Sequence, residues 1–268
     1  MKLKVLVDNN TYIDQYYLGE PAVSYYIEDE GTKILLDVGY SDIYIKNAHA
    51  FGIDLGDVDK IVISHGHDDH TRGFNYYFNE FPQSQIDVVG HPDAFKEKVF
   101  DGVKICSPLL AEDLKRQCNL ILSKGSYKVS ENITFLGQIP ISNNFEAREG
   151  IGQQKEGDHF VEDLLLDDSA LVYQTPKGIY VITGCSHSGI CNIVQYAKEV
   201  TGQKKVLGII GGFHLFDLND RVKQTIDYLF KENIEAFYPC HCTSFEVRAE
   251  MSKTLNVNEV GVGLEVNW

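Results

Sequence analysis

The residues that could carry chemistry gather in one short run, the six residues from His65 to His70. His65 and His67 stand two positions apart, so they project to the same side of an extended segment. Asp69 and His70 follow where the chain should begin to turn. Imidazole nitrogens and carboxylate oxygens are common ligands of zinc, manganese and iron. The spacing therefore predicts two metal positions, one held by His65 and His67 and the other by Asp69 and His70.

A purely structural role for this cluster would require a separate hydrogen-bond partner for each buried ring or carboxylate. A group of surface histidines without function is the alternative interpretation. A bound metal pair can polarise a substrate oxygen and lower the pKa of bound water to around 7, giving hydroxide at neutral pH. Asp69, as both ligand and hydrogen-bond acceptor, could orient that water. The first functional hypothesis is therefore metal-dependent hydrolysis of an ester, a phosphoester or a similar bond in a small molecule.

The elements that must position this run start with residues 60–64, a continuous apolar stretch typical of a strand buried on both faces. Each half of the chain is rich in β segments and ends with helical segments, an order that two stacked sheets with outer helices satisfy. We therefore expect an α/β protein with a four-layer αββα sandwich, in which two mixed β-sheets carry helices outside. The expected strands are 3–7, 22–28, 33–38, 60–64, 87–90, 169–174, 179–183, 205–210 and 236–238, with 128–136 as a strand or one arm of a hairpin. The expected helices are 42–51, 93–100, 189–200 and 220–232.

The chain shows no tandem repeat and no linker rich in Pro, Gly or Ser. We therefore expect a single domain over residues 1–268, with a variable middle segment at about 74–168. Within that segment, residues 143–158 are polar and contain glycine, which predicts a mobile loop that could act as a lid.

Composition narrows the classes of partner. The 24 Lys and Arg residues are outnumbered by 39 Asp and Glu residues, which gives a formal net charge of -15. This charge repels phosphate backbones and argues against nucleic-acid binding, although local positive charge or metal can still hold a small anionic substrate. No stretch approaches the roughly 18 apolar residues of a membrane helix, and the start lacks the features of a secretory signal. We expect a cytoplasmic protein that does not bind membranes.

The histidine run at the end of an apolar strand resembles the signature of the metallo-β-lactamase fold superfamily. Residues 35–39 are similar to its upstream motif, whose aspartate, here Asp37, supports the metal loop without binding metal. Residues 180–185 are similar to the strand that usually ends in a metal-bridging aspartate. Residues 238–241 are similar to the final strand, whose histidine, here His241, completes the second metal position. The resemblance covers nearly the whole chain and implies two divalent ions, with zinc expected first and manganese, magnesium or iron as alternatives.

Four short strings, at residues 7–10, 184–189, 211–215 and 240–243, resemble the subgroup named for a dihydropterin-methyl-ribofuranosylaminobenzene-phosphate synthase. That resemblance implies a second hypothesis, a transferase that joins a pterin methyl diphosphate to an arylamine and releases diphosphate. The substrate would then be pterin-like and anionic. A third hypothesis is a di-iron redox or metal-binding module, although such relatives normally carry a flavodoxin-like partner domain for which this chain has no room.

Several positions depart from the superfamily pattern. Cys185 stands where the bridging aspartate is usual, and a thiolate would favour softer ions. His187 is the competing ligand, and we assign it because imidazole suits every ion considered. The usual third-motif histidine has no clear counterpart, so His91, His159 and, in space, His187 are candidates, with a surface role as the alternative for the first two. His214 follows a glycine pair and is assigned to substrate contact or proton transfer, with a hydrogen-bonded core histidine as the alternative. The predicted metal ligands are His65, His67, Asp69, His70, His187 and His241, and the predicted catalytic residues are Asp69 and His214.

Overall fold

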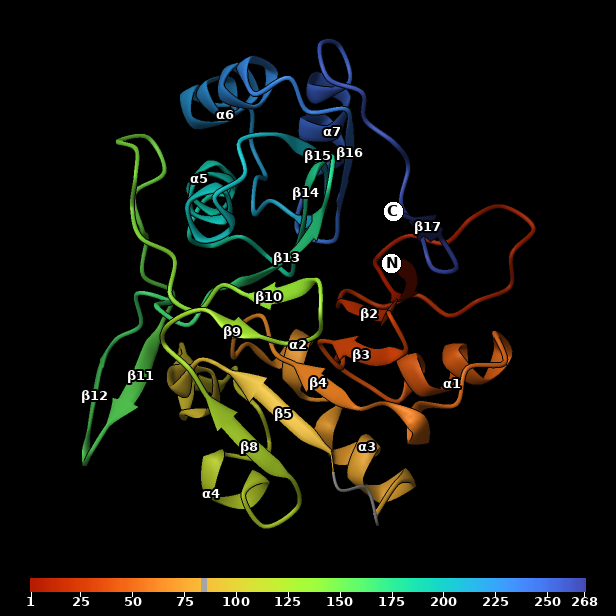
Figure 1. Ribbon diagram of the computed structural model, residues 1–268. Helices are drawn as coiled ribbons and strands as arrows, with labels where there is room; N and C mark the ends of the chain where they lie inside the picture. Colours follow the sequence, from red (N-terminus) through yellow and green to blue (C-terminus); the bar gives the residue numbers. More distant parts are fainter. Residues whose placement is uncertain (83–85) are drawn as a thin grey trace.

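The computed structural model describes residues 1–82 and 86–268, and its main feature is a pair of mixed β-sheets packed face to face (Figure 1). The first sheet has the strand order β17-β1-β2-β3-β4-β5-β8. Its strands are β1 (Lys2–Val7), β2 (Ser24–Asp29), β3 (Thr32–Leu36), β4 (Lys60–Val62), β5 (Asp87–Gly90), β8 (Asn119–Leu122) and β17 (Glu265–Asn267). Strands β3, β4, β5 and β8 run parallel to one another, whereas β17, β1, β2 and β3 are antiparallel neighbours.

The second sheet has the order β16-β15-β14-β13-β10-β9, with β14, β15 and β16 parallel. Its strands are β9 (Tyr127–Lys128), β10 (Ile133–Phe135), β13 (Ala170–Thr175), β14 (Gly178–Thr183), β15 (Val206–Gly212) and β16 (Ala236–Cys240). A smaller antiparallel sheet stands beside these two and consists of β6 (Lys98–Phe100), β7 (Val103–Lys104), β11 (Gln153–Glu156) and β12 (His159–Glu162).

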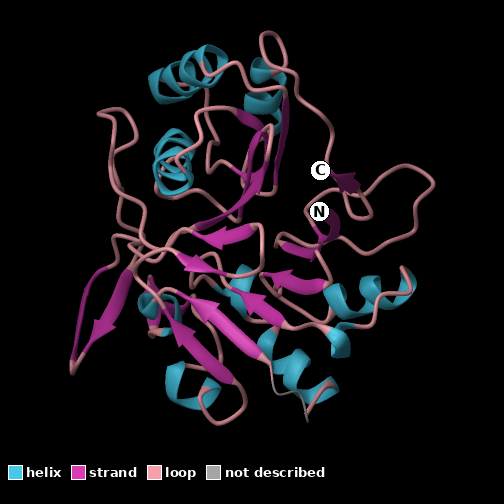
Figure 2. Ribbon diagram, in the orientation of Figure 1, coloured by secondary structure: helices cyan, strands magenta, loops and turns pink. Residues whose placement is uncertain are grey.

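Helices cover the outer faces of both large sheets (Figure 2). The first sheet carries α1 (Ile43–Ala50) and α3 (Phe74–Glu80), the second carries α5 (Ile190–Thr201), α6 (Asp220–Lys231) and α7 (Phe245–Met251), and the single turns are α2 (Asp68–Thr71), α4 (Ala111–Leu114) and the 3-10 segments Leu55–Asp57 and Pro92–Phe95.

Alternation of buried residues along the strands explains the layers. In β4, Ile61 packs with the helices of the first half, and its neighbour Val62 packs between the sheets. Ile209 and Ile210 of β15 divide in the same way between the second group of helices and the sheet interface. Because successive side chains point to opposite faces, a strand covered on both sides is apolar throughout. The expected four-layer αββα sandwich with two mixed sheets is therefore confirmed.

Two expectations for the middle of the chain were wrong in part. The helix expected at 93–100 is a 3-10 segment, Pro92–Phe95, followed by β6, because β6 pairs with β11 and the buried Lys98 ammonium reaches two carboxylates from an extended backbone. The loop expected at 143–158 extends only to residue 152. Beyond it, β11 and β12 form a hairpin around Gly157, whose left-handed backbone suits the turn.

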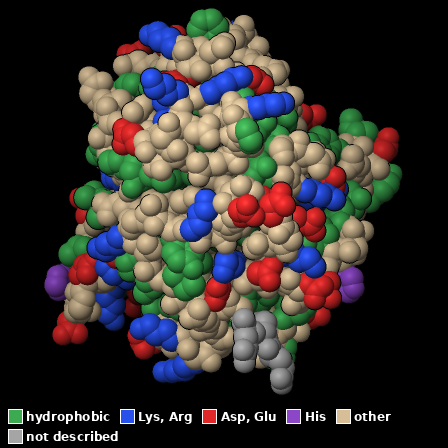
Figure 3. Space-filling view, in the orientation of Figure 1, with side chains coloured by type: hydrophobic (Ala, Val, Ile, Leu, Met, Phe, Trp, Pro, Cys, Tyr) green, Lys and Arg blue, Asp and Glu red, His purple; other side chains and the backbone are tan. Residues whose placement is uncertain are grey.

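The chain ends lie side by side at the edge of the first sheet, where the Met1 ammonium donates to the Trp268 carbonyl at 2.8 Å (Figure 1). On the face shown in Figure 3, Lys and Arg side chains are scattered among Asp and Glu and do not form a continuous stripe. None of the helices in the described part of the chain has the length and apolar composition needed to cross a lipid bilayer.

Candidate metal centre

The site lies where the carboxyl ends of strands from both large sheets meet. The histidine run follows β4 of the first sheet, and Cys185 and His187 follow β14 of the second. His214 and His241 follow the next two strands, β15 and β16. Parallel strands end at a common edge, so segments more than a hundred residues apart in the sequence deliver their side chains to one place. All six predicted metal ligands come together there, in overlapping groups whose ligand atoms lie within 4.8 Å of one another.

Three imidazoles face one another at what we call the first position. Nε2 of His65 lies 3.1 Å from Nδ1 of His67 and 3.2 Å from Nε2 of His187. Burial lowers the pKa of His65 and His187 well below the usual value. Burial and the nearby Lys98 charge lower the pKa of His67 to about 4. An uncharged imidazole has one ring nitrogen free to accept, so three such rings this close together could hold a cation between them.

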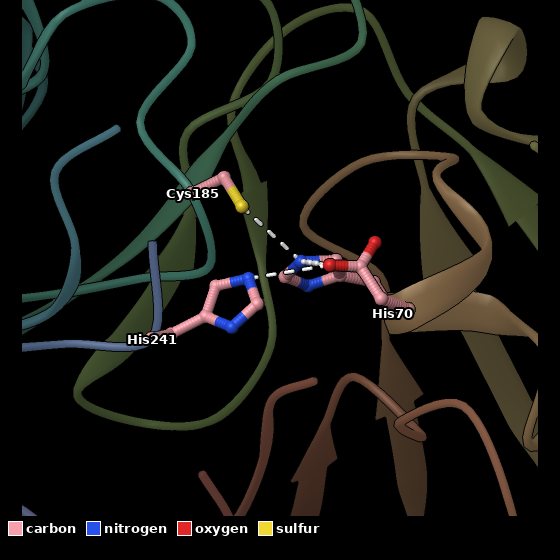
Figure 4. A group of neighbouring side chains, drawn as sticks. His70, Cys185 and His241 are labelled. Carbon is pink, nitrogen blue, oxygen red and sulfur yellow. Dashed lines mark hydrogen bonds and ion pairs between the residues drawn. The ribbon is translucent and has the colours of Figure 1, made fainter. Parts of the chain in front are cut away.

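A second group surrounds the Asp69 carboxylate and defines the second position (Figure 4). Its Oδ2 lies 3.5 Å from Nε2 of His70 and 3.3 Å from Nε2 of His241. Burial alone would raise the pKa of Asp69, but the two histidines hold it well below the usual range. Burial likewise acts to lower the pKa of His70, yet the carboxylates of Asp69 and Asp37 outweigh it and raise that pKa. This position concentrates negative charge beside imidazole, as a cation site requires.

The thiol of Cys185 belongs to both groups. Its Sγ lies 3.2 Å from Nε2 of His70, and it falls within one ligand group with His65 and His187 and within another with Asp69, His70 and His241. Figure 4 shows Cys185, His70 and His241 pointing toward one another from separate segments. The structure thus places both Cys185 and His187 at the site, and both stay candidate ligands. His187 stands beside His65 and His67, and it stays a candidate for the role of the third-motif histidine.

The Asp37 carboxylate holds the segment from Ser64 to His70 in place. Its Oδ1 accepts from the Ser64 backbone N–H at 2.7 Å, and its Oδ2 faces Ser64 Oγ and His70 Nδ1, each at 2.7 Å. Ser64 Oγ in turn lies 3.1 Å from Nδ1 of His65. The opposite segment can approach this closely because residue 184 is glycine, and a side chain there would collide with Ser64 and Asp37. These contacts leave Nε2 of both histidines directed at the two positions.

His241 is oriented by the start of the chain. Its Nδ1 lies 3.0 Å from Oδ1 of Asn9, and its backbone N–H donates to Oδ2 of Asp8 at 3.0 Å. Within the described residues, Nε2 of His241 is buried and makes no hydrogen bond, although it lies 3.3 Å from Oδ2 of Asp69. The sequence does not reveal this role, because an Asp-Asn pair after a strand is typical of an ordinary turn.

Two further carboxylates were also missed. Asp167 accepts from the backbone N–H of Gly66 at 2.7 Å. Asp168 accepts from the N–H groups of His187 and Ser188 at 3.0 and 2.9 Å. Burial raises the pKa of Asp168 to about 6. The available signal was an adjacent pair of aspartates immediately before a strand, which by itself reads as a turn.

A pocket of about 440 Å³ opens over the two positions. Phe100, Ile105, Ile151 and Phe216 supply its apolar wall, and no Lys or Arg is among the described residues that line it. His214 also lines it, with its ring centroid 4.1 Å from that of His187. In the described part of the chain, Nδ1 of His214 is buried without a hydrogen-bond partner, so the alternative of a hydrogen-bonded core histidine finds no support at that atom.

The remaining candidates lie elsewhere. His91 is buried after β5, and its Nδ1 accepts from the backbone N–H of Asp93. His159 is exposed on β12. Neither belongs to a group of potential metal ligands among residues 1–82 and 86–268.

Comparison with known proteins agrees with this geometry. The chain is 34% identical over 258 residues to an uncharacterized protein of Methanocaldococcus jannaschii, covering 95% of each chain. It is 30% identical over 261 residues to the 7,8-dihydropterin-6-methyl-4-(beta-D-ribofuranosyl)-aminobenzene-5'-phosphate synthase of the same organism, covering 92% of this chain and 88% of that one. The solved structure of Tm1679, described as a metal-dependent hydrolase of the beta-lactamase superfamily, superposes with a TM-score of 0.84 at 25% identity over 100% of this chain and 99% of the other. Residues 18–241 match the family model of the metallo-beta-lactamase superfamily, and the chain belongs to that superfamily.

Proposed function

We propose that the chain is an enzyme that cleaves an ester or phosphoester-type bond in a small molecule with the help of two divalent metal ions. The observation that carries the proposal is that three groups of potential metal ligands share Cys185, which lines the pocket. A bound cation would also satisfy buried ring nitrogens such as Nε2 of His67 and of His241, which have no hydrogen-bond partner among the described residues and have lost their hydrogen bonds to water.

The ligands divide by position. The ion at the first position would be held by His65, His67 and His187, and the ion at the second by Asp69, His70 and His241, with Cys185 between them. Imidazole and thiolate together favour zinc over magnesium or manganese.

Neighbouring groups prepare three of these histidines for metal. Ser64, Asp37 and Asn9 lie at the Nδ1 atoms of His65, His70 and His241, respectively. A partner at Nδ1 fixes the tautomer that leaves the Nε2 lone pair free, and it also fixes the direction of the ring. Hydrogen bonds within this chain therefore give three of the proposed ligands the tautomer and the ring direction that metal binding requires.

Two divalent ions held here would polarise a substrate oxygen and lower the pKa of a bound water to around 7. Asp69 would hold the second ion through Oδ2 and orient the attacking group. His214 lines the pocket beside the first position, where its imidazole could carry a proton to the leaving oxygen. The wall formed by Phe100 and Phe216 would exclude water from the reacting bond.

A second candidate is transfer of a pterin-type group to an arylamine with release of diphosphate. The 30% identity to a synthase of that kind favours it. So does the pocket, because Phe100, Phe216 and Ile151 offer apolar surface to a flat ring. Since no cation lines the described part of the pocket, the anionic end of such a substrate would have to meet the metal positions.

One experiment separates the two reactions. Zinc-loaded protein is incubated with a pterin methyl diphosphate, with and without an arylamine, and diphosphate release is measured. His65→Ala serves as the inactive reference, and His159→Ala, an exposed histidine outside the site, serves as the matched control. Release without amine supports hydrolysis, and release that requires the amine supports transfer. Equal release by wild type and His65→Ala would contradict both.

A further inference from the structure

Two neighbouring carboxylates join the segments that carry the first ligand group. Asp167 and Asp168 precede β13, and both are fully buried. Asp167 Oδ2 accepts from the N–H of Gly66, which lies between His65 and His67. Asp168 Oδ1 accepts from the N–H of His187, and Oδ2 accepts from the next N–H along the chain. One pair of adjacent residues therefore touches the backbone beside all three imidazoles of the first position.

The backbone that these carboxylates contact lies in irregular segments. His187 falls between the end of β14 at Thr183 and the start of α5 at Ile190, next to Ser186, whose φ of 62° is left-handed. Gly66 lies between β4 and α2, and a side chain there would collide with the Ala94 backbone. Neither N–H takes part in a sheet or helix ladder, so its direction depends on a side-chain acceptor.

We propose that Asp167 and Asp168 are positioning residues that set the distance between the His65–His67 segment and His187, and so determine the affinity of the first metal position. The inference rests on the proposed metal-dependent function. It assigns to the two carboxylates no contact with substrate or metal. Their effect is transmitted through backbone N–H groups, and a shift of a few tenths of an ångström in ligand separation is enough to weaken a metal site.

Lys98 extends this connection to the pocket wall. Its fully buried Nζ lies 2.9 Å from Asp167 Oδ1 and 2.6 Å from Asp163 Oδ2. Lys98 and Phe100 are both on β6, two positions apart. Strand β6, which carries Phe100 of the pocket wall, is thus joined through Lys98 and Asp167 to the segment that carries His65 and His67. We infer that the buried ion pairs of Lys98 fix which segments lie together and add little to the free energy of unfolding.

The test compares metal affinities of the whole protein at each position. Asp168→Asn keeps the size of the side chain but leaves one acceptor where two N–H groups need one each, so one N–H loses its partner. We expect zinc dissociation constants from chelator competition to rise about 10- to 100-fold at one position and to stay within about threefold at the other. Reference variants identify the position, since His187→Ala weakens the first and His241→Ala the second.

Asp29→Asn is the matched control. Asp29 is also a buried carboxylate, and it accepts from Ser130 Oγ and from the backbone and side chain of Asn132, away from the ligand groups. It should lower the melting temperature without changing either metal affinity. If Asp168→Asn behaves like this control, the proposal is overturned.

Asp167→Asn is a milder second variant, because its carbonyl oxygen can still accept from Gly66 while the charge facing Lys98 is lost. A smaller loss of affinity at the same position supports the proposal, and unchanged affinity or a loss at the second position overturns it, even if Asp168→Asn does not fold. Failure of the proposed function has a different signature, since wild type itself would then bind fewer than two ions.

Discussion

Asp37→Asn tests whether a carboxylate that binds no metal itself positions the residues that do. Asp37 is fully buried, and its two oxygens serve three donors, the backbone N–H and the Oγ of Ser64 and the Nδ1 of His70, each at 2.7 Å. An asparagine has one acceptor oxygen and one amide group of similar size. Whichever way the amide turns, one or two donors then face an NH₂ group.

The cost can be worked from these contacts. A buried hydrogen bond to a charged group contributes about 1.5–3 kcal/mol, so loss of one or two lowers the free energy of unfolding by about 1.5–6 kcal/mol. When the NH₂ group takes the Oδ2 side, the tautomer of His70 changes as well, and when it takes the Oδ1 side, the Ser64 backbone N–H loses its acceptor. Opposite an amide NH₂, Nδ1 of His70 must accept, which places the proton on Nε2, the nitrogen beside Cys185 and Asp69. With that tautomer, affinity at the second metal position should fall about 10- to 100-fold.

Two measurements check this prediction. Thermal unfolding in excess chelator gives the change in stability without metal, and chelator competition gives the two zinc dissociation constants. Asp29→Asn should lower the stability of the metal-free protein without changing zinc affinity, since its partners Ser130 and Asn132 belong to no ligand group in the described residues. Unchanged zinc affinity at both positions in Asp37→Asn would refute the argument that this carboxylate positions the ligands through Ser64 and His70.

Three further predictions follow from the site. Cys185→Asp should shift metal uptake from zinc toward manganese, measured by metal analysis of protein loaded from an equimolar mixture, because a carboxylate is the harder ligand. Two irons with redox activity in the wild type would instead favour a redox module. Phe100→Ala or Phe216→Ala should each raise KM for an aromatic substrate about three- to tenfold with little change in kcat, since an aromatic contact contributes about 0.5–1.5 kcal/mol; unchanged KM would remove them from the substrate site. In the metal-free protein, burial and the Lys98 charge keep the pKa of His67 at about 4, below the usual 6.5, so the unfolded chain takes up the proton first as the pH falls. Stability present above pH 6.5 should decline toward pH 4 by about 3 kcal/mol, and chemical denaturation of wild type and His67→Ala at several pH values should differ accordingly.

Much of the sandwich could be predicted because its strands are buried on both faces. Residues 60–64 and 205–210 are continuous apolar runs, and both prove to be strands between a helix layer and a second sheet. The histidine run was equally visible, because four potential ligands in six residues have few structural explanations. Local sequence was sufficient wherever burial or ligand chemistry acts on neighbouring residues.

The middle of the chain was less predictable because its conformation depends on distant partners. Lys98 looks like a surface residue of a short helix, yet it is fully buried on β6 between Asp163 and Asp167. The sequence around Lys98 does not indicate these ion pairs, because Asp163 and Asp167 are more than sixty residues away. Local sequence could not separate Cys185 from His187 for a related reason, because the backbone between them turns and lets both side chains reach the site.

That turn belongs to a wider pattern that links the fold to the site. Asp37, Ser186, His214 and His241 all have left-handed φ values, of 58°, 62°, 48° and 49°, although none is glycine. Each follows the end of a strand, β3, β14, β15 or β16, at the edge where the two sheets meet. A non-glycine residue in this region costs on the order of 1 kcal/mol or more, so glycine would be easier for the backbone. Glycine would remove the carboxylate of Asp37, the imidazoles of His214 and His241, and the hydroxyl of Ser186, which donates to the Gly212 carbonyl at 2.7 Å. The strain therefore persists at these four positions because the chain must turn sharply after each strand and also place a polar side chain at the same residue. Composition and periodicity do not predict such a requirement.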